Sequence, residues 1–240
     1  MLCLHKRLDW KVLAWWVALL SVALAIKHHY SIATAAELDW MLHPLSQLLE
    51  WFSGHPFHRN SLYEWVSESA DVRLVKACAG INFLLMSLVA WAWVFRPDRH
   101  EDADVPTWVA GWVLVLFGVI FAAWATSLLA NSLRILVVMN LPVHGDGLHR
   151  LIGMLIYVPL LSLQLHLGDR GNWKAALAGP VILYLLLMAV VPVLTGNAFN
   201  NPWQFSEHLL YLCAMVTIMG GIYSVYIGTR YLKSINNHSL

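Results

Sequence analysis

Three residues in this chain combine side chains that can carry out acyl transfer: Cys78, Arg134 and His149. A thiol is a strong nucleophile once ionised, and it ionises readily near cations or at a helix N-terminus. Histidine can take the thiol proton and later return one to a leaving amine. An arginine can stabilise the oxyanion of a tetrahedral intermediate, and one such donor contributes roughly 3–4 kcal/mol. We therefore examine whether the chain brings these three residues together.

The neighbours of Cys78 suit a reactive thiol at a helix contact. Alanine and glycine flank it in the sequence ACAG, and small residues let transmembrane helices approach closely. Asn82 follows four residues later, which predicts a position on the same helical face. Arg73 and Lys76 precede the thiol, and they and the N-terminus of the following helix would favour its ionised form. Together with Arg59, these two cations are candidates for substrate binding.

Arg134 and His149 also have companions at helical spacing. Ser127, Asn131 and Arg134 follow one another at intervals of four and three residues, which predicts a polar stripe on an apolar helix. Such a stripe normally faces protein or a water-filled cavity, because lipid cannot satisfy its hydrogen bonds. Gly153 lies one turn after His149 and offers a further position of close approach.

Each of these residues also has a purely structural explanation. A free cysteine in an apolar helix usually serves packing, an arginine near a helix end usually extends to the interface, and a histidine at a membrane boundary is often interfacial. Their coincidence at one membrane level favours a site. His144, in the sequence PVHGDGLHR, is an alternative to His149, and Cys213 is either a packing residue or a partner for Cys78.

The composition indicates a membrane protein. Of the 240 residues, 59% are hydrophobic and 12% are charged, whereas soluble domains carry about 25% charged residues. The 13 tryptophans agree with this, since Trp concentrates where membrane meets water. A net charge of +1 argues against a nucleic-acid partner, and three separated cysteines exclude a zinc ribbon or a disulfide framework. We expect neither a metal nor a cofactor.

Apolar runs long enough to cross a bilayer, which takes about 20 residues, occur at 10–26, 74–95, 108–134, 149–167, 175–194 and 208–228. Segment 37–52 is apolar on one side and contains Pro44, which predicts an interfacial helix broken by the proline. We expect an all-α polytopic membrane protein with about six transmembrane helices and one outer interfacial amphipathic segment. A single domain over 1–240 is the simplest organisation.

The distribution of lysine and arginine predicts that both termini lie in the cytoplasm. The two terminal segments and the loops on their side carry more basic residues than the opposite side, and basic loops tend to stay inside. Cys78, Arg134 and His149 then all lie at the outer ends of their helices. The long segment 27–73 lies on the same outer side and is a candidate lid over a substrate.

Three motifs resemble those of the exosortase/archaeosortase family, and most of all its exosortase K subgroup. They are ACAG at 77–80, NSLRI at 131–135 and HRLIG at 149–153. The family pattern is a Cys in A-C-[SA]-G, then N-x-x-R at the end of a helix, then a His with a Gly four residues later. All three elements occur here in order, over about a third of the chain. Ala79 replaces a common Ser that has no chemical role.

The resemblance implies a membrane cysteine protease and transpeptidase of the bacterial inner (cytoplasmic) membrane. Such an enzyme cleaves the C-terminal sorting signal of exported proteins, a short motif followed by a transmembrane helix and a basic tail, on the outer (periplasmic) face. Family roles carry over as Cys78 nucleophile through a thioester, Arg134 transition-state stabiliser and His149 acid/base. The supporting positions are Gly80, Asn82, Asn131 and Gly153. The implied partners are the sorting-signal segment, the lipid bilayer and an acceptor nucleophile that the sequence does not identify.

Other classes of protein agree less well with the sequence. A haem protein needs histidines facing each other across helices, but most of the 12 histidines lie in loops or at span ends. Transporters place polar groups near the bilayer midplane, whereas the polar groups of this chain gather at one membrane surface. The GxSxG of serine hydrolases and the HExxH of metalloproteases do not occur. The remaining alternative is a non-enzymatic or transport membrane protein whose outer histidine-rich loop binds a ligand or a metal.

Overall fold

A computed structural model describes residues 10–96, 105–141, 146–168, 173–194 and 196–200, and scattered positions from there to 221. At several positions, which include 105–110 and 146–150, the description covers the backbone alone. The chain forms two compact units, Met1–Trp173 and Lys174–Leu240. The expectation of a single domain stays a prediction, and each unit is described by itself.

The first unit is built from long helices. They are α1 (Trp10–Ile32), α2 (Asp39–Ser53), the short 3-10 turn η1 (Lys76–Ala79), α3 (Ile81–Val94), α4 (Val105–Met139) and α5 (Asp146–Gly168). Among the described residues, four stretches are long and apolar enough to cross a membrane: Trp10–Ile32, Lys76–Val94, Gly111–Met139 and Leu151–Gly168. They match the first four predicted spans, so the expectation of a mostly helical membrane protein is confirmed to this extent.

The second unit contains α6 (Trp173–Leu185), a π-helical turn (Leu186–Val190), α7 (Val191–Leu194) and α8 (Asn197–Asn200). The helical stretch from α6 through α7 coincides with the fifth predicted span, 175–194. Much of the sixth predicted span, 208–228, lies outside the described residues.

Side-chain contacts set the directions of α1 and α3. Lys27 near the end of α1 contacts Asn82 at the start of α3, whereas Trp16 contacts Trp93 near the end of α3, with 6.3 Å between ring centroids. The two helices are therefore antiparallel. The C-terminal end of α1 and the N-terminal end of α3 meet at one end of the unit, as alternating spans require.

The same end of the unit receives α4 and α5. Phe83 stacks on Tyr157 at 4.3 Å, and a Cβ at Gly168 would lie 3.2 Å from the Cα of Val94. Helices α3 and α5 are thus parallel, and α4 runs antiparallel to both. The C-terminal end of α4 and the N-terminal end of α5 consequently lie beside the start of α3.

Helix α3 is the centre of this bundle. It packs against α1, α4 and α5, and nine of its 14 residues are buried. Besides the Lys27–Asn82 contact with α1, hydrogen bonds join it to α4 and α5: Trp91 Nε1 donates to Thr126 Oγ1 at 3.1 Å, and Gln164 Nε2 donates to Ser87 Oγ at 2.9 Å. Such bonds between helices support packing where lipid offers no partner.

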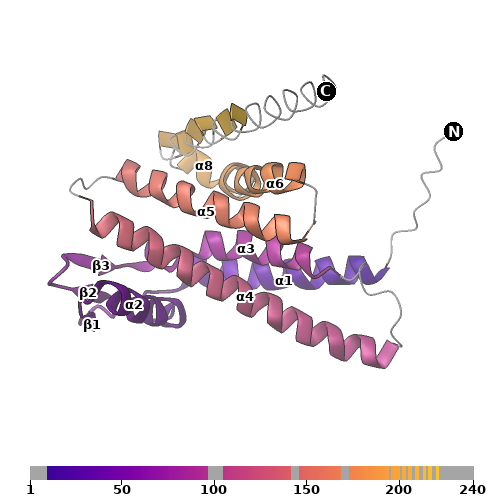
Figure 1. The fold of residues 1–240 in the computed structure, drawn as a ribbon, viewed down its shortest axis with the longest axis horizontal. Helices are drawn as coiled ribbons and strands as arrows, with labels where there is room; N and C mark the ends of the chain where they lie inside the picture. The colour runs from indigo at the N-terminus through magenta and orange to yellow at the C-terminus, as the bar shows by residue number, and fades with distance from the viewer. Residues whose placement is uncertain are drawn as a thin grey trace, which may run out of the picture. The chain divides into compact units, whose positions relative to one another are not determined.

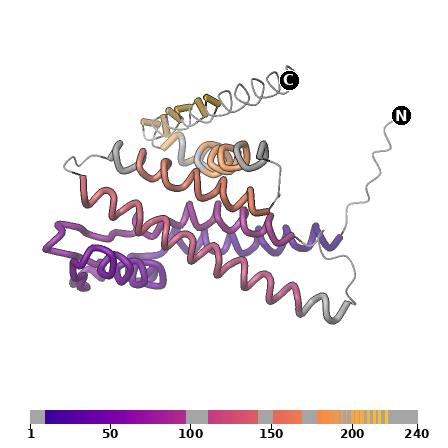
Figure 2. The backbone as a smooth tube through the Cα atoms, viewed as in Figure 1, coloured from indigo at the N-terminus to yellow at the C-terminus, as the bar shows by residue number. Residues whose placement is uncertain are grey.

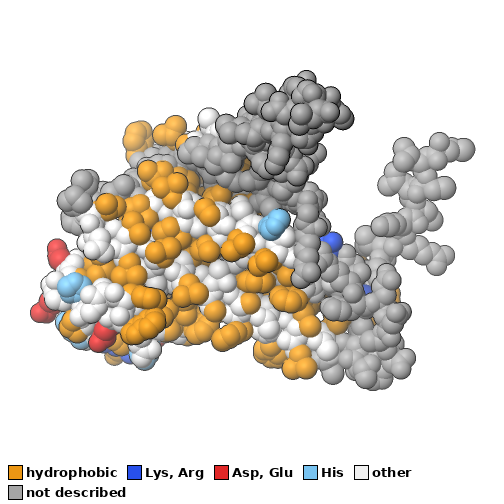
Figure 3. Space-filling view, viewed as in Figure 1, with side chains coloured by type: hydrophobic (Ala, Val, Ile, Leu, Met, Phe, Trp, Pro, Cys, Tyr) orange, Lys and Arg blue, Asp and Glu red, His pale blue; other side chains and the backbone are white. Residues whose placement is uncertain are grey.

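The outward faces of the helices carry apolar side chains in rows. Leu13, Val17, Leu20 and Leu24 of α1 are each at least half exposed, at intervals of three and four residues. Exposed Leu and Phe side chains recur in the same way along α4, and Figure 3 shows hydrophobic side chains spread over the helices. A patch of this extent is unusual in soluble monomers. It suits contact with lipid.

Helix α2 runs uninterrupted through Pro44, so the expected break at this residue was wrong. Pro44 lacks the N–H that would bond to the carbonyl four residues earlier, so the helix continues through it because its buried face is held by packing. The buried face of α2, which includes Met41, Leu45 and Leu49, packs against α4, η1 and the sheet. Gly54, with φ +72°, ends the helix and donates its N–H to Glu50 O.

A small antiparallel sheet follows α2 and was not predicted. It consists of β1 (His58–Arg59), β2 (Trp65–Ser67) and β3 (Val72–Leu74), in the order β1-β2-β3. Trp65 pairs with Arg59 on one side and with Leu74 on the other. The all-α expectation therefore holds for the bundle and misses this sheet, whose strands are too short to show a period-two pattern.

The chain returns to the bundle at the end from which it left. Figures 1 and 2 show it leaving α1, forming α2 and the three strands, and entering α3 beside the end of α4. This route places the turn with Cys78 between the sheet and the helix ends.

Candidate functional site

Cys78 lies in the turn η1 and not in α3. Its N–H donates to Val75 O at 2.8 Å, and Gly80, in the left-handed region with φ +65°, separates the turn from α3. No continuous helix joins Cys78 to Asn82, so the argument from helical spacing does not hold. Asn82 Oδ1 instead accepts a hydrogen bond from Lys27 Nζ at 2.9 Å.

Gly80 is the point where the backbone passes directly against α4. A Cβ built on Gly80 would lie 1.7 Å from Asn131 Nδ2, which no side chain could accommodate without a shift of Asn131. Ser127 Oγ lies 3.4 Å from the Gly80 carbonyl oxygen, to which it donates. Space and backbone angle therefore both require glycine here. The close approach expected for the ACAG sequence exists at this residue.

Asn131 connects α4 to α5 as well as to the turn. The residue is fully buried, and its Nδ2 donates to Ser127 O at 2.9 Å. Its Oδ1 accepts a hydrogen bond from Tyr157 Oη at 2.5 Å. The polar stripe expected on this helix thus faces protein, because Ser127 is also fully buried.

Arg134, one turn beyond Asn131, lies against α5. Its guanidinium carbon is 5.7 Å from the centroid of the Tyr157 ring. A Cβ at Gly153 would be 3.4 Å from Arg134 Cδ and 3.5 Å from a Tyr157 ring carbon, so Gly153 leaves room for both side chains. Arg134 Nε and Nη2 are buried, and no hydrogen-bond partner for them occurs among the described residues. Buried charged donors normally have partners, so these two are suited to a group that the described residues do not supply.

Arg134 and the Cys78 thiol lie within electrostatic range of each other, and so do the thiol and the Tyr30 hydroxyl. Cys78 is half-buried. Two predicted positions, Gly80 and Arg134, thus lie near Cys78. Two more, Asn131 and Gly153, contact Gly80 and Arg134 respectively.

The two candidate histidines are less completely defined. His149 belongs to α5, one turn before Gly153, and the spacing of four residues puts both positions on one helix face. The side chain of His149 lies outside the described part of the chain, and so does the whole of His144. That His149, and not His144, acts as the acid/base stays a prediction.

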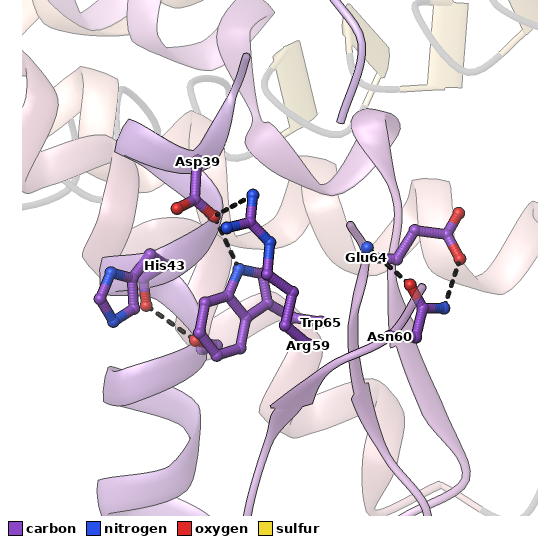
Figure 4. Close-up of polar contacts among 7 residues, drawn as sticks. Asp39, His43, Arg59, Asn60, Glu64 and Trp65 are labelled. Atoms are coloured by element: carbon purple, nitrogen blue, oxygen red, sulfur yellow. Dashed lines mark hydrogen bonds and ion pairs between the residues drawn. The ribbon is translucent and has the colours of Figure 1, made fainter. Parts of the chain in front are cut away.

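Arg59 and Arg73 have carboxylate partners in the region of α2 and the sheet. Arg59 Nη2 lies 3.7 Å from Asp39 Oδ1, the oxygen that also accepts a hydrogen bond from Trp65 Nε1 at 2.9 Å. Arg73 Nε lies 3.6 Å from Glu64 Oε2. Figure 4 shows the first of these groups, with Arg59 and Trp65 converging on Asp39. Both arginines contribute to the local structure, and a role in substrate binding stays a prediction.

Lys76 ties the reactive turn to the end of α1. Its Nζ donates to Ala33 O at 2.7 Å and to Ser31 O at 3.3 Å, and it lies 5.0 Å from the centre of the Tyr30 ring. A cation at the C-terminal end of a helix is favourable, because the last carbonyl groups lack partners. That Lys76 favours the ionised form of the Cys78 thiol stays a prediction.

A pocket of about 310 Å³ opens beside the thiol. One wall is formed by residues 70–74, which include β3, and Cys78 also contributes to the lining. The other wall is the apolar end of α4, with Ile135, Val138 and Met139. A second pocket of about 390 Å³, lined in part by His55 and Ser69, shares Ala70 and Met139 with it.

The histidines of α2 and the following sheet region make separate contacts. His43 stacks on Trp65 at 4.9 Å, His55 shares a hydrogen bond with Ser69, and His58 lies 3.8 Å from Glu68. No group of three His, Cys, Asp or Glu residues that could hold a metal occurs within the described ranges. A metal-binding role of this segment therefore has no geometric support there.

Tyr157 is the site residue that sequence reasoning missed. It contacts Asn131 through its hydroxyl and Arg134 through its ring. It follows Gly153 by four residues and His149 by eight, so its position on the same face of α5 was readable from the spacing. From sequence alone, however, a tyrosine in an apolar helix is interpreted as a packing residue, because its hydrogen-bond partners are not known.

The arrangement is thus a cysteine turn, an arginine with two buried donor nitrogens and a neighbouring pocket, held by contacts among three helices. An assignment of function must rest on such a site, because a fold alone does not imply function. Comparison of the chain with family models, curated proteins and solved structures finds no significant match.

Proposed function

We propose that this chain is a membrane cysteine peptidase and transpeptidase of the exosortase type. The observation that carries the proposal is Arg134, whose buried Nε and Nη2 have no partner among the described residues and whose charge acts on Cys78. Preorganised donors beside a nucleophile are what stabilisation of an oxyanion requires. The resemblance of the three motifs to the exosortase pattern identifies the reaction, and the pocket beside the thiol offers room for a substrate.

The reaction is acyl transfer through a thioester. The Cys78 thiolate attacks the carbonyl carbon of the scissile peptide bond, and Arg134 hydrogen-bonds to the oxyanion that forms. His149 accepts the thiol proton and delivers it to the departing amine as the C–N bond breaks. Water or an acceptor amine then attacks the thioester, and the thiolate is released.

The surrounding residues position these groups. Asn131 lies against Gly80 and thereby fixes where the turn meets α4. Tyr157 holds Asn131 through its hydroxyl and lies under the guanidinium of Arg134. A displacement of about 1 Å at a reacting group can cost about a hundredfold in rate, so these contacts matter for the chemistry.

The substrate is the C-terminal sorting signal of an exported protein, a short motif followed by a transmembrane helix and a basic tail. It is cut on the outer face of the bacterial inner membrane, with about six spans and both termini of this enzyme in the cytoplasm. Helix α2 lies in the outer interface. Its exposed Trp51 and Phe52 support this position, because aromatic side chains favour the membrane–water boundary.

The test is cleavage of an anchored reporter. A library of exported reporters, each ending in a randomised short motif, a transmembrane helix and a basic tail, is co-expressed with the enzyme, and released C-termini are identified by mass spectrometry. We expect cleavage with wild type and with Cys213→Ala, the control at another free cysteine. Cys78→Ser should leave the anchor intact, and Arg134→Gln should lower the rate by about 10²- to 10³-fold.

Addition of hydroxylamine to the same assay tests the thioester. A thioester intermediate transfers its acyl group to hydroxylamine, so the released protein should end in a hydroxamate. Normal cleavage by Cys78→Ser, in membranes that contain the variant at wild-type level, would refute the proposed chemistry.

A further inference from the structure

Strand β3 is an edge strand of the small sheet. It pairs with β2 on one side, and no strand covers its other side within the described residues. An edge strand presents backbone N–H and C=O groups that can pair with another chain. Proteins that bind extended peptides use such edges, where backbone hydrogen bonds contribute affinity and adjacent pockets contribute specificity.

The pocket beside Cys78 follows this open edge. Its wall includes all three residues of β3, Val72, Arg73 and Leu74, and the two turn residues before them. Successive side chains of a strand point to opposite faces of the sheet, so a pocket that touches all three lies along the edge and not over one face. Its volume of about 310 Å³ falls at the lower end of the range for ligand pockets.

The edge leads directly to the thiol. Strand β3 ends at Leu74, Val75 keeps an extended backbone, and η1 with Cys78 follows at once. Both Cys78 and the strand contribute to the same pocket. A peptide paired with β3 would therefore continue toward the sulfur without leaving the pocket.

We infer that the substrate binds as an extended peptide that adds a strand to the free edge of β3, with its scissile bond at Cys78. The opposite wall of the pocket, formed by Ile135, Val138 and Met139, is apolar. The segment that binds therefore carries apolar side chains toward α4. This inference rests on the proposed role of Cys78 as a nucleophile and specifies how its substrate is held.

The test compares a peptide reagent with a simple one at the same thiol. Acetyl-Val-Val-Ala-chloromethyl ketone and iodoacetamide are reacted with the full-length Cys213→Ala protein in detergent, and modification of Cys78 is followed by mass spectrometry. Each rate is divided by the rate of the same reagent with glutathione. We expect the normalised rate of the peptide reagent to exceed that of iodoacetamide at least tenfold.

Methylation of single peptide nitrogens identifies strand addition specifically. In an added strand, alternate residues direct their N–H groups toward the neighbouring strand. Two analogues of the reagent, methylated at adjacent peptide nitrogens, should therefore differ: one loses the rate advantage and the other retains it. Equal rates for both analogues would overturn the proposed binding mode.

Two variants of α4 provide a matched comparison. Val138→Trp fills the pocket and should abolish the advantage of the peptide reagent while iodoacetamide still reacts. Leu129→Trp, on an exposed part of the same helix, should leave both rates unchanged. Reaction with iodoacetamide but no preference for the peptide reagent refutes strand addition alone. A Cys78 that reacts with neither reagent refutes the proposed function as well.

Discussion

Two polar regions lie at the same end of the helices and are built in opposite ways. We call the first the buried junction, formed by Gly80, Ser127, Asn131 and Tyr157. We call the second the surface cap, formed by Asp39, Arg59, Glu64, Trp65 and Arg73. In the junction, hydrogen bonds join residues of different elements, and every polar side chain is buried. In the cap, the ion pairs measure 3.6 and 3.7 Å and the side chain of Arg73 is 61% exposed.

The energetic consequences differ accordingly. Loss of one partner in a buried hydrogen bond costs about 1–3 kcal/mol, because the other partner stays desolvated. An exposed ion pair contributes about 0–1 kcal/mol and is screened by salt. The difference teaches where rigidity is needed: the junction positions Arg134 and the cysteine turn, while the cap, of which only Arg73 lines the pocket, is held by weaker contacts.

The largest effect is expected for Gly80→Ala. The new methyl group would clash with Asn131, and a left-handed backbone costs an alanine about 1–2 kcal/mol. With about 1–3 kcal/mol for overpacking, we expect a loss of roughly 2–5 kcal/mol in unfolding free energy, measured by thermal unfolding in detergent.

Gly54→Ala is the matched control for Gly80→Ala. Gly54 is also left-handed, with φ +72°, but nothing lies within 4 Å of its Cβ position. We expect it to lose only the conformational part, about 1–2 kcal/mol. Equal losses in the two variants would mean that contact with Asn131 does not constrain the turn.

Arg134→Met should separate activity from stability. We expect reporter cleavage to fall by about 10²- to 10³-fold, since the oxyanion loses its donor. The melting temperature should stay the same or rise, because the substitution removes buried charged donors that have no partner among the described residues. Arg134→Lys keeps the charge without the planar fork and should recover little activity. A drop in melting temperature as large as that of Gly80→Ala would indicate a structural arginine.

Tyr157→Phe tests one bond of the buried junction. It removes the hydroxyl that donates to Asn131 Oδ1 and keeps the ring beside Phe83 and Arg134. We expect a loss of about 1–3 kcal/mol in stability, measured by thermal unfolding. Tyr157→Leu removes the ring as well and should lower reporter cleavage further than Tyr157→Phe does. Identical cleavage by both variants would argue that the ring does not position Arg134.

Arg59→Gln tests the surface cap. The ion pair with Asp39 is partly exposed, so we expect a loss below about 1 kcal/mol that diminishes as salt is added. Thermal unfolding at low and high ionic strength checks this. A loss as large as that of Tyr157→Phe, independent of salt, would remove the distinction between junction and cap.

The smallest effect concerns Glu37, in the exposed connection between α1 and α2. Hydrogen bonds from the backbone N–H and the hydroxyl of Thr34 hold the pKa of Glu37 below its ordinary value of 4.5. The stability gained from them is present above that value and is lost as the pH falls through the lower folded pKa. Glu37→Gln should therefore reduce the acid dependence of the melting temperature slightly below pH 4.5. An unchanged acid profile would contradict this.

The bundle was largely readable from the sequence. Long apolar runs with few charges located the four described helices that are long and apolar enough to cross a membrane, because a bilayer demands uninterrupted apolar length. Alternation of the spans then predicted that Cys78 and Arg134 lie at the same end. The three strands were not readable, since two or three residues give no alternation signal. The continuity of α2 through Pro44 depends on tertiary packing of its buried face, which the local sequence does not encode.

The sequence predicted which residues belong to the candidate site, but it did not predict which of them contact each other. The sequence singled out Gly80 and Asn131 separately, but only the structure shows that one excludes a side chain at the other. Lys76 suggested a cation for the thiol, yet its ammonium group donates to carbonyls 43 and 45 positions earlier in the chain. Contacts at such separations depend on tertiary packing, which no local pattern encodes.

The contact of Gly80 with α4 also has a consequence for biosynthesis. Ser127, which donates to the Gly80 carbonyl, is translated 47 residues later. While the ribosome is still making this intervening stretch, the turn with Cys78 can pack against α2 and bond to the end of α1, but its contact with α4 cannot yet form. The side of the turn that faces α4 is therefore completed only after α4 has been made.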